Sequence, residues 1–532
     1  MKDEIKAVAL LPARMLRLAP AAPRFILHPS SFILRLSEFS ILLLLCGCLF
    51  FQGIGSRELW ASHEARAAQN AQRMLDDGNW LLPRLYDGQV ELQKPPGFYW
   101  LVALTGLARG GVDAWAVRLP AAIAGTLTVF LVWWHLRRRG RPVAAFVAAA
   151  MLAGAVHFTG TARIGRIDVP LAFAVTAIML IARDGLGERS GVSRPMPSPS
   201  GGLRRSARLL ILGSLAGVAL LLKGPIGVVL PAVALASFCL IERVPVRRLL
   251  LPVLTIAAIA LAIAVPWYVW ANAETDGEFF RVFFLHHHFH RALGGSDALA
   301  GHPWWFYLPR LAADFLPWTP LLLAALVARR WRGDADARFG LIWLVAMVAV
   351  LSLSRFKRAD YLLPAYAGAA IFVGCAVERW YLLRTPRTQV RAACGLALVL
   401  TLLPAGWLVF DQVVTTKEEA ARDQRPFAHE TRKFVPSPEP VVLFRVESHL
   451  LVYHLGRPVY TLVEWADLNA AVRRPVLTFV VTRAEFVDEV RQRVGVPVQV
   501  VVRSDESVPS RPHQPLVLLQ FGSEIWPTPP RD

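Results

Sequence analysis

The sequence predicts a mainly α-helical fold, a polytopic transmembrane helix bundle followed by a small C-terminal external α/β domain. Of the 532 residues, 55% are hydrophobic and only 18% are charged, whereas a soluble domain averages roughly 25% charged residues. Long apolar runs recur along the chain, several of them close to the roughly 17–25 residues that a helix needs to cross hydrocarbon. Since backbone groups in lipid must bond to one another, we expect these runs to form helices.

Eleven apolar segments are candidate spans, although short ones such as 168–183 are weaker than the rest. They are 37–54, 115–136, 142–160, 168–183, 207–222, 225–241, 249–271, 304–328, 338–354, 361–378 and 391–411. A further segment, 95–111, holds only about a dozen apolar residues, which is more typical of a re-entrant or interfacial helix. The predicted total is therefore about eleven spans, or about thirteen if that segment and another short helix insert.

The net charge of +19 indicates membrane topology rather than nucleic-acid binding. Basic residues are concentrated in five loops between spans, which begin at Arg137, Arg183, Arg243, Arg329 and Arg379. These loops fall on one side if the spans alternate, and an excess of Lys and Arg marks the cytoplasmic side. The distribution predicts no nucleic-acid partner, a cytoplasmic N-terminus, and an external position for everything after residue 412.

This topology divides the chain into three parts. They are a cytoplasmic segment at 1–36, a transmembrane domain at 37–412 with an external loop at 55–114, and an external, periplasmic domain at 413–532. In the last part, segments typical of strands (440–446, 458–463, 476–482 and 498–504) alternate with segments typical of helices. Such alternation predicts a small α/β domain. It contains no glycine-rich nucleotide-binding motif.

Ionisable residues gather on the predicted external side of the bundle. Glu64 and Asp168 are the carboxylates, and the cations include Arg66, Lys94 and Lys223, with others near 291 and 357. Charged groups at membrane depth are costly and are by default candidates for function. Cations bind phosphate, and a carboxylate serves as a general base or binds a metal. This combination favours an enzyme that handles a lipid phosphate.

Each of these residues also has a structural interpretation. Ser62 could cap a helix whose first turn holds Glu64, where a negative charge favours the helix dipole. Asp168 could cap the apolar run that follows it. The cations Lys94, Arg291, Lys357 and Arg358 could extend to lipid headgroups. The histidines at 286–288 and 290 point to different faces of a helix, so at most two could share one metal ion.

Six motifs of the chain are similar to those of a known family. They are HEARAAQNAQRML, GNWLLPRLYDGQVELQKPPGFYWL, RIGRIDVPLA, LLKGPIGVVLP, FFLHHHFHRALGG and SRFKRADYLLP. Through them, the chain resembles the polytopic glycosyltransferases of the GT-C class, nearest the bacterial aminoarabinose transferases and the dolichyl-phosphate-mannose protein mannosyltransferases. The resemblance extends over residues 40–375.

The resemblance implies a sugar donor linked to a polyprenyl phosphate, a lipid, glycan or protein acceptor, and transfer at the external face of a bacterial inner membrane. It implies Asp168 as the first catalytic carboxylate and Glu64 as the second. The family's leading aspartate is replaced by His63, which shares a helical face with Arg66. His63 is therefore a candidate neutral base.

The resemblance also implies a site for the donor phosphate. Its contacts would be Arg66, Lys94, Arg291 and Tyr361, and the nearby cations Lys357 and Arg358 join them as candidates. The family's metal-associated glutamate is Gln93 here, which weakens a divalent-metal site. His288 still matches the position of a histidine ligand, so the metal is left open.

Two other functions share these features. A polyprenyl-lipid transporter or flippase would need the same bundle and the same phosphate-binding cations. The sequence shows no repeat between its halves of the kind found in many transporters, and its ionisable groups gather outside rather than at mid-membrane. The departures at His63 and Gln93 leave room for a catalytically dead member of the fold. The sequence does not identify the sugar, the acceptor or the oligomeric state.

Overall fold

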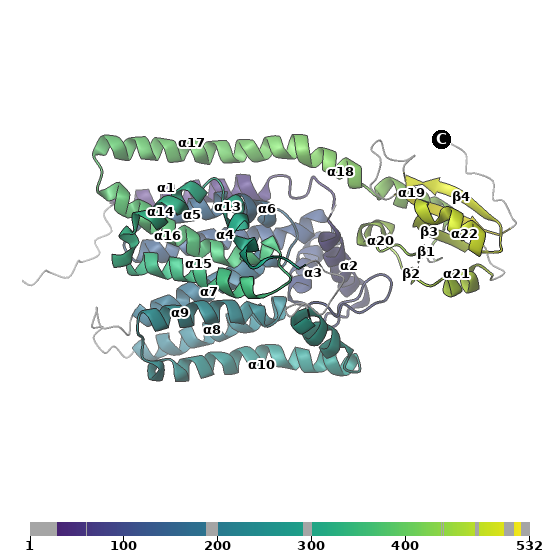
Figure 1. The fold of residues 1–532 in the computed structure, drawn as a ribbon, viewed down its shortest axis with the longest axis horizontal. Coiled ribbons are helices and arrows are strands. Elements are labelled where there is room, and N and C mark those ends of the chain that lie inside the picture. The colour runs from purple at the N-terminus through teal and green to yellow at the C-terminus, as the bar shows by residue number, and fades with distance from the viewer. Residues whose placement is uncertain are drawn as a thin grey trace, which may run out of the picture. The chain divides into compact units, whose positions relative to one another are not determined.

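The computed structural model describes residues 29–59, 61–187, 200–290, 301–437, 439, 441–473, 478–504 and 515–522. Residues Met1–Ile41 and Leu42–Asp532 form two units, and every contact discussed below lies within the second. In Figure 1 this second unit consists of a bundle of long helices, which leads through α17 and α18 into a small sheet.

The bundle confirms the predicted helical class. Among the described residues, seven helices are long and apolar enough to cross a membrane, or up to nine if each bent pair counts as one span. The long helices match the predicted spans. They are α1 (Pro29–Cys46), α4 (Ala114–Arg138), α7 (Asp168–Gly187), α8 (Ser200–Lys223), α10 (Leu250–Glu274), α15 (Ala335–Leu353), α16 (Leu363–Leu382) and α17 (Pro386–Phe410), with the shorter α9 (Ile226–Ile241).

Two predicted spans are bent pairs of helices rather than straight ones. In the first, α5 (Pro142–Gly154) and α6 (Val156–Ala162) meet at 64°. In the second, the segment Trp304–Asp314, which includes α13 (Tyr307–Asp314), meets α14 (Thr319–Ala328) at 113°. A backbone hydrogen bond links the two bends to each other: the Val156 N–H donates to the carbonyl of Leu316 at 2.9 Å. This bond gives the α6 terminus a backbone partner from outside its own helix.

The predicted external loop holds two helices, α2 (Ser62–Asp77) and α3 (Gly97–Arg109). At 13 residues, α3 is shorter than a span, as expected for the 95–111 segment. Ala61, not Ser62, is the N-cap of α2, and no side chain caps it. The prediction that Ser62 caps this helix is therefore wrong, although Glu64 does lie in the first turn, as expected.

The C-terminal part forms a five-stranded sheet of order β2-β1-β3-β5-β4. Its strands are β1 (Val441–Phe444), β2 (Val459–Leu462), β3 (Thr478–Arg483), β4 (Val498–Arg503) and β5 (Leu516–Phe521), and its helices include α20 (His449–Leu455), α21 (Trp465–Val472) and α22 (Val487–Arg493). β1 pairs in parallel with β2 and β3, whereas β5 pairs antiparallel with β3 and β4. The sequence predicted four of these strands and missed β5, whose six residues are all buried.

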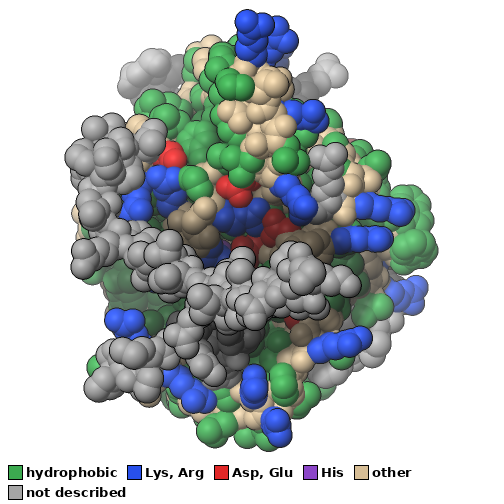
Figure 2. All heavy atoms as spheres, turned by 90° about the vertical axis from the view of Figure 1, so that its left-hand side faces the viewer, with side chains coloured by type: hydrophobic (Ala, Val, Ile, Leu, Met, Phe, Trp, Pro, Cys, Tyr) green, Lys and Arg blue, Asp and Glu red, His purple; other side chains and the backbone are tan. Residues whose placement is uncertain are grey.

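The basic loops come together at one end of the bundle. Ion pairs join them, including Arg139–Asp184 at 3.5 Å, Arg139–Asp336 at 2.8 Å, Arg141–Glu378 at 2.7 Å and Arg338–Glu242 at 2.7 Å. Figure 2 views the end that lies at the left of Figure 1, and Lys and Arg side chains ring that face. The five loops therefore share one side, as the alternation of spans requires.

Candidate functional site

Asp168 lies at the start of α7 and is 5% exposed. Its carboxylate accepts a hydrogen bond from the ammonium group of Lys223, the last residue of α8. The other carboxylate oxygen lies 3.8 Å from Nε of Arg166. Lys223 also lies over the ring of Tyr361, 4.3 Å from the centroid. Two residues that sequence analysis named, Asp168 and Tyr361, are thus joined through one lysine.

A second carboxylate, Asp360, completes this cluster. Its Oδ2 lies 2.8 Å from an Arg166 nitrogen, so Arg166 bridges Asp168 and Asp360. Its Oδ1 lies 3.2 Å from Nε2 of His157, whose Nδ1 lies 3.0 Å from the Tyr366 hydroxyl. Sequence analysis missed Asp360 and His157. Asp360 stands in the quoted SRFKRADYLLP motif, which could have identified it.

His63 contacts Arg358, with 3.2 Å between its Nε2 and the guanidinium. Because arginine can only donate, Nε2 is the acceptor and carries no proton. Burial lowers the pKa of His63 to about 3, and the positive charges of Lys94, Arg166 and Arg358 act in the same direction. His63 is therefore neutral at physiological pH, and the lone pair on its Nε2 already accepts the bond from Arg358. This geometry favours a role in orienting Arg358 over a role as base.

Lys94 is partly buried, and its ammonium group has no hydrogen-bond or ion-pair partner within contact distance among the described residues. Burial lowers its pKa to about 8, the positive charges of Arg66 and Lys223 add to the effect, and Glu91 and Asp168 oppose it. At neutral pH most of the lysine is charged. An unpaired, partly desolvated ammonium group is well suited to bind an anion.

Arg66 lies beside Lys94 and is held by two residues. Its Nε is 3.2 Å from the carboxylate of Glu91, and its NH1 donates to the side-chain oxygen of Gln93 at 2.9 Å. Glu91 is 3% exposed and was not among the predicted residues. Glu91 Oε2 and Gln93 Oε1 therefore both face Arg66, while Glu91 Oε1 accepts from the Gln93 N–H at 2.9 Å.

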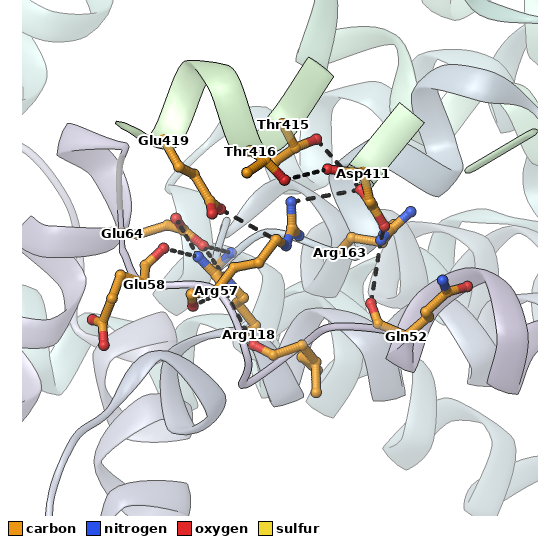
Figure 3. A network of polar contacts seen from close by, with 12 residues as sticks. Gln52, Arg57, Glu58, Glu64, Arg118, Arg163, Asp411, Thr415, Thr416 and Glu419 are labelled. Atoms are coloured by element: carbon orange, nitrogen blue, oxygen red, sulfur yellow. Dashed lines mark hydrogen bonds and ion pairs between the residues drawn. The ribbon is translucent and has the colours of Figure 1, made fainter. Parts of the chain in front are cut away.

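Glu64 lies away from this cluster in a fully buried ion pair, shown in Figure 3. Both of its oxygens accept from Arg118, at 2.7 and 3.2 Å, and one also accepts from the Gly165 N–H at 3.0 Å. Arg118 donates in addition to the carbonyls of Ile54, Arg57 and Glu58. Both carboxylate oxygens of Glu64 are engaged in these bonds, so the geometry favours a positioning role for Glu64 over a role as base.

Lys357 also differs from its predicted role. It is 3% exposed, and its ammonium group donates to the backbone carbonyls of His302 and Ser354. These bonds hold the loop before α16 in place. Among the described contacts none brings Lys357 to the cluster around Asp168, whereas its neighbour Arg358 contacts both His63 and Asp360.

Two predicted residues cannot be compared with this site. Arg291 lies outside the described residues, and so does the side chain of His288, although its backbone belongs to η3 (Arg281–His290). Within the described part of the chain, no group of three or more His, Cys, Asp or Glu side chains could hold a metal ion.

The cluster joins a buried carboxylate to several cations. Asp168 pairs with Lys223 and Arg166, while Lys94 and Arg358 offer positive charge nearby. An ionised carboxylate can accept a proton. Fixed cations can stabilise the negative charge that develops on a leaving phosphate. The arrangement thus provides the groups for transfer from a phosphate-linked donor.

Comparison with known proteins shows what the chain is similar to. Residues 41–277 match a family described as dolichyl-phosphate-mannose-protein mannosyltransferase. The chain is 32% identical over 373 residues to the undecaprenyl phosphate-alpha-4-amino-4-deoxy-L-arabinose arabinosyl transferase of Pseudomonas aeruginosa (strain LESB58), which covers 69% of this chain and 64% of that protein. It is 31% identical over 331 residues to a transferase of the same description from Pseudomonas fluorescens (strain Pf0-1), covering 61% and 55%. The matches therefore span less than two thirds of these relatives.

Solved structures share the fold. The crystal structure of ArnT from Cupriavidus metallidurans bound to undecaprenyl phosphate has a TM-score of 0.75 at 19% identity, covering 92% of this chain and 98% of that one. The archaeal oligosaccharyltransferase AglB from Archaeoglobus fulgidus has a TM-score of 0.58 at 14% identity, covering 85% and 70%. With the apolar helices, these matches show an integral membrane protein.

Proposed function

We propose that this chain, whose residues 41–277 match the dolichyl-phosphate-mannose-protein mannosyltransferase family, transfers a sugar from a polyprenyl-phosphate-linked donor. The acceptor is a lipid, glycan or protein at the external membrane face. The observation that carries this proposal is the buried Asp168 carboxylate, which lies among fixed cations. A nucleotide-sugar site is not needed for this reaction.

In the proposed reaction, Asp168 removes the proton of an acceptor hydroxyl as that oxygen attacks the anomeric carbon of the sugar. The bond from this carbon to the phosphate oxygen breaks, and the electron pair leaves with the lipid phosphate. Lys94 binds the phosphate, and Arg358 and Lys223 add positive charge near it. The proton ends on Asp168. Attack from the face opposite the phosphate inverts the anomeric centre.

The donor lipid that we propose is undecaprenyl phosphate, with 4-amino-4-deoxy-L-arabinose as the first sugar to test and lipid A as the first acceptor. The donor lipid and the sugar are those in the names of relatives at about a third identity, whereas lipid A is chosen as one member of the lipid acceptor class. The replacement of the family's aspartate by His63 and of its glutamate by Gln93 makes a different sugar the natural second choice.

We propose that the basic end of the bundle faces the cytoplasm of a bacterial inner membrane, because arginine-rich loops are retained there. The segment 1–36 would then be cytoplasmic, and the transmembrane domain would extend over 37–412. The loop 55–114 and the α/β domain at 413–532 would be external. This orientation puts Asp168 and Lys94 on the side where lipid-linked sugars are used.

Turnover tests the proposal. The purified protein in lipid vesicles is given undecaprenyl-phosphate donors labelled in the sugar, together with lipid A. Release of labelled sugar onto the acceptor supports a transferase. Movement of intact donor across the bilayer without cleavage would instead show a flippase. Tight donor binding with neither result would show a catalytically dead member of the fold.

A further inference from the structure

The short segment Arg163–Asp168 joins α6 to α7 and carries both Arg166 and Asp168. It lies close against α4, because a Cβ atom at Gly165 would lie 2.2 Å from Cγ1 of Val117 and 2.8 Å from its carbonyl oxygen. Glycine at this point lets the backbone approach, and the Glu64 carboxylate accepts from its N–H. This fixes the middle of the segment, but not its beginning.

The beginning of the segment is held by a residue from the far end of the chain. Arg163 is 2% exposed, and its guanidinium donates to the carboxylate of Asp411 and to the carbonyl of Gln52 at 3.2 Å. It also lies over the ring of Trp407, 4.9 Å from the centroid. Trp407 lies near the end of α17, and Asp411 is the first residue of the short helical segment that follows it, η7 (Asp411–Thr415).

Asp411 is itself oriented by its surroundings, as Figure 3 shows. The Thr415 hydroxyl donates to its carboxylate at 3.4 Å, and a nitrogen of Arg57 lies 3.8 Å from the same group. Among the described residues, Asp411 is the one carboxylate paired with Arg163. Two nitrogens of Arg163 have no hydrogen-bond partner there, so loss of Asp411 would leave a buried cation without its counter-charge.

The spanning part of α17 has no buried residue among those described. Its contact with the catalytic segment therefore depends on the few groups at its end, chiefly Asp411 and Trp407. An ion pair at that point couples the C-terminal third of the chain to the position of Asp168.

We infer that Asp411 is a positioning residue for the transfer reaction. By holding Arg163, it fixes the start of the 163–168 segment and thereby the places of Arg166 and Asp168. The inference rests on the proposed function for its kinetic consequence, but the anchoring itself does not. Small misplacements of a reacting group are costly, since about 1 Å can lower a rate by roughly 100-fold.

The anchoring is tested without any substrate by hydrogen–deuterium exchange of the full chain in lipid nanodiscs. Asp411→Asn should speed exchange of the backbone amides of 163–167, and Asp411→Glu should restore most of the protection. Glu418→Gln is the matched control, because Glu418 lies nearby on α18 (Thr416–Arg422) in an exposed pair with Arg422. Unchanged exchange in Asp411→Asn would overturn the inference.

Kinetics test the consequence. Asp411→Asn should lower kcat by roughly 10- to 100-fold while leaving the donor KM within about twofold, and Asp411→Glu should recover most of kcat. Arg163→Gln combined with Asp411→Asn should be no slower than the worse single variant, because both remove one interaction. Additive losses, or a change in KM alone, would contradict a positioning role.

The two proposals fail in different ways. If the wild type transfers no sugar from any donor, the proposed function fails and the exchange result still decides the anchoring. If the wild type is active and Asp411→Asn matches it, the positioning role fails and the function stands. If Asp411→Asn does not fold, Arg163→Gln takes its place, because it removes the same ion pair. Normal exchange and normal kcat in that variant would overturn the inference.

Discussion

Glu64 and Arg118 form a two-point ion pair in which neither side chain is exposed to solvent. The pair links α2 to α4, and through the Gly165 N–H it reaches the segment that carries Asp168. A residue that the family resemblance offers as catalytic thus contributes a buried ion pair that braces α2 against α4, and we propose Asp168 for the proton transfer.

Arg118→Met should destabilise the protein by about 3–5 kcal/mol, because it leaves the Glu64 carboxylate buried without a partner. Denaturant unfolding in detergent measures this loss. Lys433→Gln serves as the comparison, since Lys433 forms an exposed pair with Glu430 and such pairs contribute at most about 1 kcal/mol. Equal losses in the two variants would contradict the brace.

Donor binding should weaken as the pH rises through about 8, because Lys94 binds phosphate in its charged form and its pKa is lowered to about 8. The bound phosphate raises the pKa of Lys94. The pH at which donor affinity begins to fall therefore reports the pKa of Lys94 in the donor-free protein. In Lys94→Arg the charge persists, since a guanidinium stays protonated above pH 12. Titration of donor affinity from pH 6 to 10 measures both. A parallel decline in the two proteins would show that Lys94 is not the titrating group.

His63→Gln should leave the pH–rate profile between about pH 5 and 8 unchanged, because a histidine whose pKa is lowered to about 3 does not titrate there. Glutamine keeps an acceptor for Arg358. Loss of the acidic limb of the profile in this variant would instead identify His63 as the base.

Stability provides a separate check on His63. In the unfolded chain this histidine titrates near 6.5, but in the folded protein it stays neutral down to about 3. The unfolded state therefore binds the extra proton between these values, and stability should fall as the pH drops from 6.5 toward 3. His63→Gln should lose this contribution. Unfolding curves at pH 7 and pH 5 measure this fall in stability for the wild type and for His63→Gln.

Lys357→Met should reduce stability by about 1–3 kcal/mol, because two partly buried carbonyls lose their donor. It should leave donor affinity within about threefold of wild type. Arg358→Met is the contrasting variant, since Arg358 reaches His63 and Asp360 and should lower turnover. Paired binding and unfolding measurements separate these effects. A large loss of donor affinity in Lys357→Met would return this lysine to the phosphate site.

The helical class, the short α3 and the alternating C-terminal elements could be predicted, because hydrophobic length and period are local properties of sequence. The bends at α5–α6 and α13–α14 could not, since they depend on a backbone bond between distant segments. β5 was missed because it is buried along its whole length and lacks the alternation of a half-exposed strand.

At the site, Asp168, Lys94, Arg358 and Tyr361 lie where a motif-based prediction expects a polar cluster. The sequence could not separate the carboxylate proposed as the base from the one in a buried ion pair, because Glu64 and Asp168 differ in their distant partners, Arg118 and Lys223. Asp360 and Glu91 were missed for the same reason. Their roles depend on Arg166 and Arg66, and such pairings exist only in the folded chain.

The most direct test compares sugar transfer by wild type and Asp168→Asn, purified in lipid and given a labelled undecaprenyl-phosphate donor with its acceptor, while donor binding is measured in parallel. We expect Asp168→Asn to lower transfer by roughly 10²- to 10⁴-fold, as for loss of a general base, while it still binds the donor lipid. Transfer that persists at the wild-type rate would show that Asp168 is not the catalytic carboxylate and would contradict the proposed mechanism.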